Sequence, residues 1–203
     1  MANDAAQSVL VIGCGALARE INAVLDAGGW GHVTLTCLPA QLHNTPDRIP
    51  EAARAAIRAG RDKGFSRILV AYADCGTGGQ LDRVVEEEGA TRLAGPHCYS
   101  FFSGNEAFAK TAEDEIATFY LTDFLARQFD AMVVKPLGID RHPELTEMYF
   151  GNYDRLVYLA QTDDPALTDK ARAAADRLGL AFERRMTGYG DLETELRQFA
   201  GTA

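Results

Sequence analysis

Residues 67–89 read RILVAYADCGTGGQLDRVVEEEG and contain the pattern of a strand, a turn and a helix. The apolar run 67–72 has the length of a buried strand, and a glycine-rich turn follows it. The amphipathic stretch after the turn ends at Gly89, as expected of the left-handed residue that often follows a helix. This segment therefore predicts a β-strand joined to an α-helix by a glycine loop.

The same pattern recurs along the chain. Further apolar runs occupy residues 8–13, 32–38, 91–95, 131–138, 155–161 and 180–186, and amphipathic stretches such as 113–129 lie between them. Apolar strands that are each followed by a helix favour a parallel sheet covered on both faces. We expect an α/β fold, a doubly wound and mostly parallel Rossmann-like three-layer sandwich of about seven strands.

The length of 203 residues suits a single α/β domain, 1–203, or two Rossmann-like lobes that divide near residues 125–135. The net charge of -9 argues against nucleic acid and anionic membranes as partners, and favours small-molecule substrates and other proteins. The sequence has neither a basic leader nor an apolar stretch long enough to span a bilayer, which predicts a cytoplasmic protein. The aromatic stretch 146–153 suits an interface between copies of the chain, so a homo-oligomer is a further expectation.

The chain has four cysteines, at positions 14, 37, 75 and 98, and no two of them have the C-x-x-C spacing. In a reducing compartment they are expected to be free thiols, metal ligands or redox groups. Cys14, Cys75 and Cys98 each follow an expected strand, whereas Cys37 falls within one. Because the carboxyl ends of parallel strands share one edge, we expect the three thiols to lie together there.

Three thiols on converging loops predict a metal site with Cys14, Cys75 and Cys98 as ligands of zinc or of a [4Fe–4S] cluster. His97 is expected to act as a fourth ligand or a proton carrier, and with Asp74 and Tyr99 it forms the candidate catalytic set. The alternative is that each cysteine is only a small apolar core residue. The loop glycines Gly76, Gly78 and Gly79 are expected to form an anion cradle, or simply a tight turn.

Residues 13–18, GCGALA, fit the dinucleotide pattern G-x-G-x-x-A, with Gly13 and Gly15 as cofactor-binding candidates. The acidic residue that should end the second strand is missing from TLTCLPAQLHN. An oxidoreductase that uses NAD(P) or a flavin is therefore the second hypothesis.

Two polar features in the second half have a structural explanation. Asp123 and Arg127 stand at helical spacing and are expected to pair on the surface. Asp164 precedes Pro165, which is an ordinary start of a helix, although both follow an expected strand.

Several motifs together resemble the domain of unknown function 1638 family, from about residue 9 to residue 196. They are CGALAREI (14–21), LPAQLHNTPDRIP (38–50), YADCGTGGQLD (72–82), GPHCYSFFSG (95–104), FYLTDFLARQFD (119–130), GIDRHPEL (138–145), YFGNYDRLVYLAQTDDP (149–165) and TGYGDLE (187–193). The resemblance implies an association with corrinoid-dependent methyltransferases and their corrinoid proteins, because members are often encoded beside them.

The cysteine pattern and the family resemblance together favour, as the leading hypothesis, a metal-binding protein of corrinoid-linked one-carbon or methylamine metabolism. A zinc thiolate site can activate a thiol as a methyl acceptor, whereas an iron–sulfur cluster suits electron transfer. The third hypothesis is a non-catalytic accessory that binds a corrinoid protein or a methyltransferase.

Overall fold

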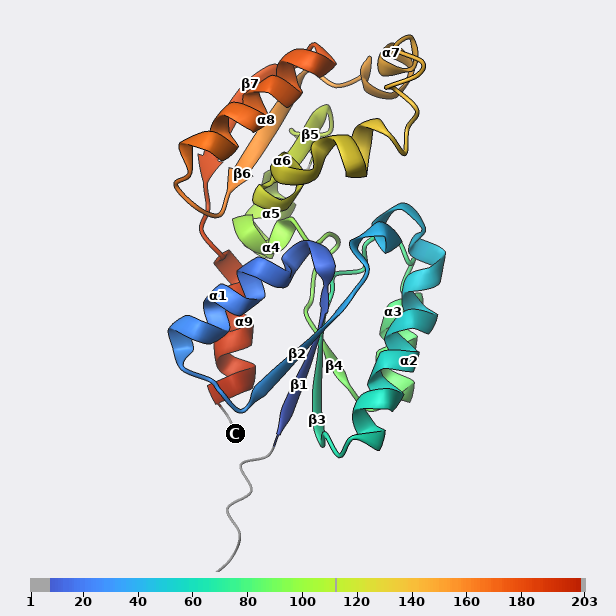
Figure 1. The fold of residues 1–203 in the computed structure, drawn as a ribbon, viewed down its shortest axis with the longest axis vertical. Helices are drawn as coiled ribbons and strands as arrows, with labels where there is room; N and C mark the ends of the chain where they lie inside the picture. The colour runs from blue at the N-terminus through green and yellow to red at the C-terminus, as the bar shows by residue number, and fades with distance from the viewer. Residues whose placement is uncertain (1–7, 112, 202–203) are drawn as a thin grey trace, which may run out of the picture. The chain divides into compact units, whose positions relative to one another are not determined.

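The computed structural model describes residues 8–111 and 113–201 (Figure 1). Contacts within the chain divide it into two units: Met1–Phe101 with Tyr189–Ala203, called the first unit, and Phe102–Gly188, called the second unit. The chain thus leaves the first unit, builds the second and returns with its last helix. The segment 125–135 lies inside the second unit.

The first unit contains a four-stranded parallel sheet in the order β2-β1-β3-β4. The strands are β1 (Val9–Cys14), β2 (Val33–Leu38), β3 (Arg67–Ala71) and β4 (Thr91–Arg92). All six residues of β1 are buried because the strand lies inside the sheet with helices on both faces. In this register Val9 pairs with Val33 on one side and with Arg67 on the other.

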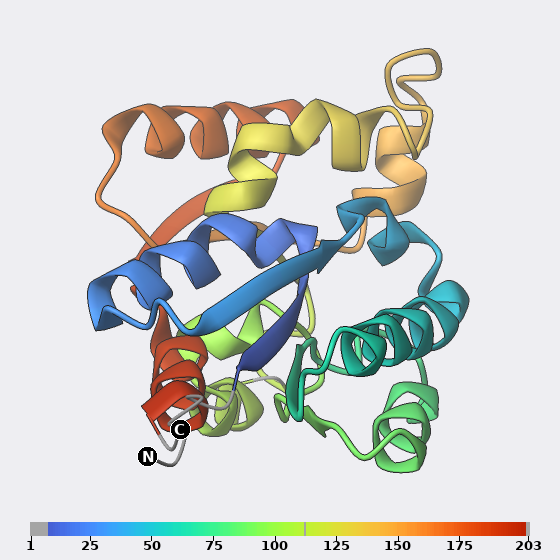
Figure 2. The same ribbon diagram turned by 60° about the horizontal axis from the view of Figure 1, so that its bottom comes forward.

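Helices cover both faces of the first sheet, so the unit has three layers (Figures 1 and 2). The helices α1 (Ala18–Gly28) and α9 (Gly190–Gly201) pack together on one face, and α2 (Ile49–Asp62) and α3 (Gln80–Glu87) on the other. Short 3₁₀ turns precede α1 and α2, namely η1 (Gly15–Leu17), η2 (Ala40–Asn44) and η3 (Pro46–Arg48).

The second unit contains a three-stranded parallel sheet in the order β5-β6-β7. Its strands are β5 (Thr118–Thr122), β6 (Arg155–Ala160) and β7 (Ala181–Met186). The helices α6 (Asp123–Phe129) and α8 (Pro165–Leu178) lie side by side over the sheet. The remaining helices around this part of the chain are α4 (Ser100–Ser103), α5 (Asn105–Thr111), the π-helix η4 (Asp130–Val134) and α7 (Leu145–Phe150).

Two parallel sheets with helices around them confirm the doubly wound α/β class, but one strand was placed wrongly. Residues 131–138 do not form a strand, because Asp130–Val134 is π-helical and turns follow it. The missing strand is β5, which lies within the stretch 113–129 that was expected to be helical. The sequence TFYLT of β5 is β-branched and aromatic, which suits a strand better than a helix.

The apolar run at 131–134 is explained by burial rather than by strand pairing. Met132, Val133 and Val134 are all buried in the π-helical segment, whose backbone bond runs from Lys135 N–H to the Asp130 carbonyl at 2.9 Å. A short apolar run marks burial but does not separate a strand from a helix. In the part of the chain that is described, no helix has the length and apolarity needed to cross a membrane.

Candidate functional site

Three cysteines stand at the carboxyl ends of neighbouring strands of the first sheet. Cys14 is the last residue of β1, Cys75 lies in the loop after β3, and Cys98 lies in the loop after β4. Since β1, β3 and β4 are adjacent and parallel, these loops emerge at one edge. Cys37 is different, because it lies within β2 and is exposed.

The sulfurs of Cys75 and Cys98 are in direct contact, with 3.1 Å between the two Sγ atoms. Two backbone hydrogen bonds hold their loops together. The Asp74 N–H donates to the Gly95 carbonyl at 3.0 Å, and the Cys75 N–H donates to the Pro96 carbonyl at 2.9 Å. The loops after β3 and β4 therefore continue side by side beyond the short pairing of their strands.

Cys14 lies beside the hydroxyl of Tyr72, a residue that sequence analysis did not single out. Tyr72 is 1% exposed, and its hydroxyl has no hydrogen-bond partner of regular geometry among the residues described. The thiols of Cys75 and Cys98 are close enough to act electrostatically on the same phenol. The hydroxyl of a buried tyrosine normally has a partner, so this one is the exception in the site. Its only signal in the sequence was its place at the end of the apolar run 67–72.

The two contacting thiols differ in their tendency to ionise. The hydrogen bond from Cys98 lowers the pKa of Cys75, with help from backbone donors and against partial burial. The same contact raises the pKa of Cys98, and burial adds to the effect. Burial raises the pKa of Cys14 as well. Cys75 is therefore the thiol of the three that ionises most readily.

The glycine loop after β3 forms an anion cradle, and its anion is the side chain of Asp74. The carboxylate accepts hydrogen bonds from Thr77 Oγ1 at 2.6 Å, Gly79 N at 2.8 Å and Gly78 N at 3.2 Å. Partial burial acts to raise the pKa of Asp74, but these donors outweigh it and lower the pKa. Asp74 thus fixes the loop that carries Cys75.

Cys75 itself has a positive φ of 50°, in the left-handed region that side-chain-bearing residues rarely adopt. Gly76, Gly78 and Gly79 also have positive φ angles, which glycine adopts without cost. The strained backbone at Cys75 persists because hydrogen bonds on both sides of it define the loop.

His97 and Tyr99 flank Cys98 and stack on each other, with ring centroids 4.9 Å apart and an angle of 11° between the planes. Burial lowers the pKa of His97, and His43 from the loop after β2 adds to this effect. The His97 carbonyl accepts from the backbone and the hydroxyl of Ser100, which fixes the start of the following turn. The lowered pKa favours the neutral form of His97, the residue directly before Cys98, and a neutral imidazole can accept a proton.

The two glycines of the GCGALA turn are explained by close internal packing. A Cβ on Gly13 would lie 2.7 Å from Ile21 Cδ1, and one on Gly15 would lie 3.0 Å from the Leu38 carbonyl and 3.1 Å from Ala40 N. The backbone after β2 therefore covers Gly15, in the place where a dinucleotide-binding turn needs open space for a pyrophosphate.

The thiols do not form a ready three-ligand metal site. Among residues 8–111 and 113–201, no three His, Cys, Asp or Glu side chains are grouped as metal ligands. Two sulfurs on one zinc ion lie about 3.8 Å apart, given tetrahedral bonds of about 2.3 Å. The Cys75–Cys98 pair, at 3.1 Å, is closer than this and much wider than the roughly 2.05 Å of a disulfide.

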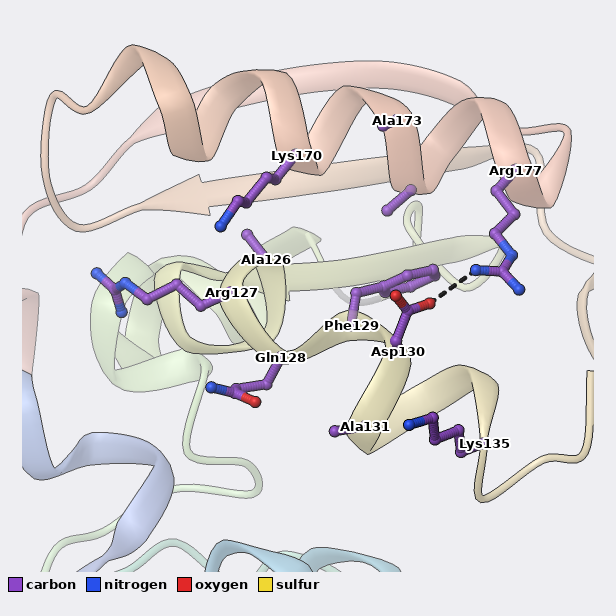
Figure 3. Close-up of a pocket in the computed structure, with 11 residues that line it drawn as sticks. Ala126, Arg127, Gln128, Phe129, Asp130, Ala131, Lys135, Lys170, Ala173 and Arg177 are labelled. Carbon is purple, nitrogen blue, oxygen red and sulfur yellow. Dashed lines mark hydrogen bonds and ion pairs between the residues drawn. The ribbon is translucent and has the colours of Figure 1, made fainter. Parts of the chain in front are cut away.

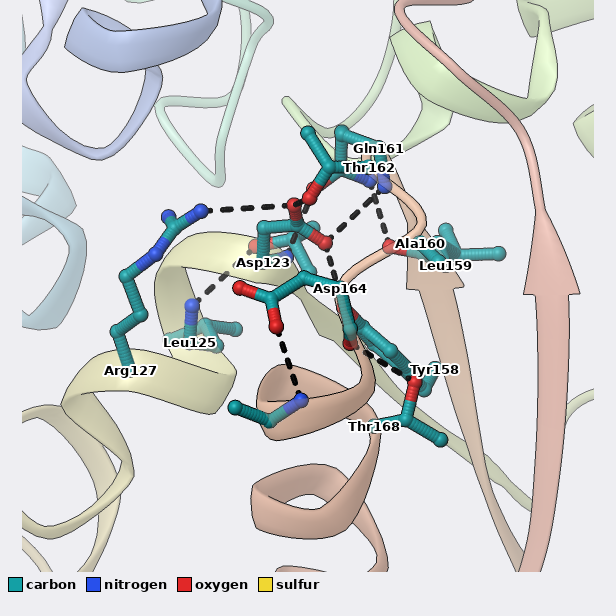
Figure 4. Close-up of polar contacts among 12 residues, drawn as sticks. Asp123, Leu125, Arg127, Tyr158, Leu159, Ala160, Gln161, Thr162, Asp164 and Thr168 are labelled. Carbon is teal, nitrogen blue, oxygen red and sulfur yellow. Dashed lines mark hydrogen bonds and ion pairs between the residues drawn. The ribbon is translucent and has the colours of Figure 1, made fainter.

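A second polar cluster lies at the carboxyl edge of the second sheet (Figure 4). Asp123 is fully buried, so the expected surface pair with Arg127 is wrong in its placement, although the two side chains do meet at 3.5 Å. The carboxylate accepts from Tyr158 Oη at 2.6 Å, Thr162 Oγ1 at 2.6 Å and Gln161 N at 3.1 Å. Both carboxylate oxygens of Asp123 therefore accept hydrogen bonds from residues of the second unit, and the cluster fixes the ends of β5 and β6.

The start of α8 in the same region is as expected. The Asp164 carboxylate accepts from Ala166 N at 2.9 Å and caps the helix, with Pro165 as its first residue.

Fold and site together define a parallel α/β protein with a cysteine pair at the carboxyl edge of its first sheet. The chain belongs to the family described as "Protein of unknown function (DUF1638)", which it matches over residues 37–196. The match includes Cys75 and Cys98 but begins after Cys14, so it is shorter than the resemblance that starts near residue 9. Neither the curated proteins nor the solved structures include a significant match to this chain.

Proposed function

We propose that this protein binds a thiophilic metal ion, with zinc the best fit, at Cys75, Cys98 and Cys14. The observation that supports the proposal is the 3.1 Å contact between Cys75 Sγ and Cys98 Sγ, beside which lies the buried pair of Cys14 and Tyr72. Soft thiolate donors select zinc over hard cations such as magnesium.

The donor set has to rearrange to hold one ion. The Cys75 and Cys98 sulfurs have to separate by about 0.7 Å to reach the spacing of two zinc ligands. Cys14 has to turn from the Tyr72 hydroxyl toward the pair. In a [4Fe–4S] cluster each cysteine binds a different iron, which needs sulfurs much farther apart, so a single ion is the better fit.

Zinc with one coordination position left for substrate would lower the pKa of a bound thiol and make it a better methyl acceptor. The residues of this chain would bind and orient the substrate around that position. His97 would accept the proton of an incoming thiol, and Asp74 would keep the Cys75 loop fixed. We include one-carbon metabolism in the same proposal as the setting of this activity, because the family resemblance implies a corrinoid link.

The test is the zinc content of the full chain purified under reducing conditions, compared among single cysteine-to-serine variants. We expect about one zinc per chain for wild type and for Cys37→Ser, whose thiol lies exposed in β2. Cys75→Ser and Cys98→Ser should lose the metal, and Cys14→Ser should bind it more weakly. Zinc well below one per chain in the wild type would contradict the proposal, as would an equal loss in Cys37→Ser.

A second candidate function is a redox-active dithiol, which the short sulfur–sulfur distance favours directly. The Cys75 thiolate would attack a small-molecule disulfide, forming a mixed disulfide and releasing one thiolate. Cys98 would then lose its proton and attack Cys75 Sγ, which releases the second thiol and leaves a Cys75–Cys98 disulfide. The small disulfide is reduced by two electrons and the cysteine pair is oxidised by two.

The dinucleotide hypothesis gains no support from the geometry around GCGALA, since internal packing accounts for Gly13 and Gly15. A methyl-transfer role is tested separately from metal binding. Zinc-loaded protein, a thiol and methylcobalamin should yield the methyl thioether and cob(I)alamin, and Cys75→Ser should not. A protein that holds zinc, binds a corrinoid protein and yields no thioether would be the non-catalytic accessory.

A further inference from the structure

A pocket of about 460 Å³ lies between α6 and α8 of the second unit (Figure 3). The small side chains of Ala126, Ala173 and Ala174 leave the space between the two helices open. The volume falls within the range of about 300–1,000 Å³ that small-molecule sites occupy. The pocket belongs to one unit and shares no residue with the thiol site.

The charged side chains around this pocket are mostly cationic. Arg127, Lys135, Lys170 and Arg177 line it, with Asp130 as the single carboxylate. Asp130 is already bound to Arg177, at 2.7 Å. The chain as a whole has a net charge of -9 and only four lysines, so two lysines in one pocket form a local positive field against an acidic background.

Lys135 and Lys170 are the available charges of the pocket. Both side chains are exposed, and within the described residues neither has a carboxylate partner. In Figure 3, Lys170 reaches from α8 toward α6, and Lys135 reaches back from the end of the π-helical segment. They approach the pocket from different elements, which suits a ligand held from two sides.

An irregular stretch of helix forms one wall of the pocket. Gln128 has non-helical angles of φ -116° and ψ 20°, and the π-helix Asp130–Val134 follows it. The bend turns the chain so that Asp130, Ala131 and Lys135 all line the pocket. Short π-helical segments occur often at functional sites, because they redirect side chains at a cost in helix stability.

We propose that this pocket binds a small anion that carries a phosphate or diphosphate group. Guanidinium groups bind phosphate oxygens through paired N–H donors, and ammonium groups supply compact charge. A multiply charged phosphate offers oxygens to several of the cations that line the pocket, whereas a single carboxylate offers fewer. This pocket is independent of the proposed metal site, because the residues that line it lie in the second unit and the cysteines lie in the first.

The probe is inorganic pyrophosphate, titrated calorimetrically into the full chain with a chelator present to remove free metal. We expect binding to the wild type and to Cys75→Ser alike, since the thiol site is not involved. Lys135→Gln/Lys170→Gln should bind at least about tenfold more weakly, because two charge-assisted contacts are lost.

The matched control is Lys63→Gln/Lys110→Gln, which removes the same charge from exposed positions outside the pocket. It should bind pyrophosphate within about a factor of two of wild type, because distant surface charges are screened. The proposal is overturned if the wild type does not bind pyrophosphate, or if the two double variants weaken binding equally.

Discussion

Cys75 Sγ and Cys98 Sγ lie 3.1 Å apart, although the residues belong to loops after different strands. The contact exists because β3 and β4 are parallel neighbours and because Asp74 and Cys75 hydrogen-bond to the opposite loop. Two thiols fixed at this distance can share a metal ion or form a disulfide with little movement. Both possibilities can be tested directly at these two residues.

The metal-free protein should form an intramolecular Cys75–Cys98 disulfide when treated with oxidised glutathione. The two sulfurs have to approach by only about 1 Å, and the pKa of Cys75 is lowered, which favours its attack. Mass spectrometry of unreduced peptides should show the link in wild type and in Cys37→Ser. Zinc-loaded protein should resist this oxidation, because the same two thiols would bind the metal. Protection by zinc would therefore show that metal binding and disulfide formation use the same cysteine pair. A link from either residue to Cys37 instead would show that the observed contact does not persist in solution.

Asp74→Asn should lower the free energy of unfolding by about 1–3 kcal/mol, because the Gly78 and Gly79 N–H groups and the Thr77 hydroxyl lose a charged acceptor. Trp30, the sole tryptophan of the chain, lies in the first unit, so its fluorescence during denaturation reports on this unit. The exposed Asp62 provides the control, and Asp62→Asn should change stability by less than about 0.5 kcal/mol. Equal stability of the two variants would mean that the carboxylate does not fix the loop.

Asp123→Asn should destabilise the second unit by about 2–4 kcal/mol, since it disturbs a fully buried carboxylate with donors on both oxygens. Tyr158→Phe removes a single donor and should cost about 1–2 kcal/mol. Hydrogen exchange of the β6 amides measures the effect locally. The matched control is Tyr149→Phe, because that ring is 42% exposed, and its exchange rates should equal those of wild type.

Glu115 gives the second unit a contribution to stability that depends on pH. The hydrogen bond from Arg185 lowers the pKa of Glu115, and bonds and charge from Tyr120 and Arg155 add to it against partial burial. Because the folded pKa lies below the unfolded value of about 4.3, the contribution is complete above that value. It is lost as the pH falls through the folded pKa.

Glu115→Gln should therefore be less stable than wild type at neutral pH, by about 1–3 kcal/mol, and the difference should shrink below about pH 4. Urea denaturation at a series of pH values measures it. Glu106→Gln removes an exposed partner of Lys110 and should leave a small difference at every pH. A gap between wild type and Glu115→Gln that widens in acid would refute the assignment.

The fold class followed from the sequence because buried parallel strands and covering helices leave strong local patterns. Two predictions of local structure were wrong: residues 131–138 are not a strand, and β5 lies in a stretch that was predicted to be helical. Residues 131–134 are apolar because they are buried, and burial in a helical segment gives the same short pattern as burial in a strand. The prediction that Asp123 lies on the surface was wrong for a related reason. Helical spacing to Arg127 does not indicate which face of the helix is buried.

The sequence by itself determined that this is a parallel α/β protein, with three cysteines at the end of a strand or in the loop that follows one. Chain order and strand direction are enough to place those residues at one sheet edge. Only the tertiary structure decided that Cys75 and Cys98 touch, that Cys14 lies beside Tyr72, and that Asp74 fills its own glycine loop. These contacts depend on loop paths and side-chain packing between segments far apart in sequence, and no local pattern records such distances.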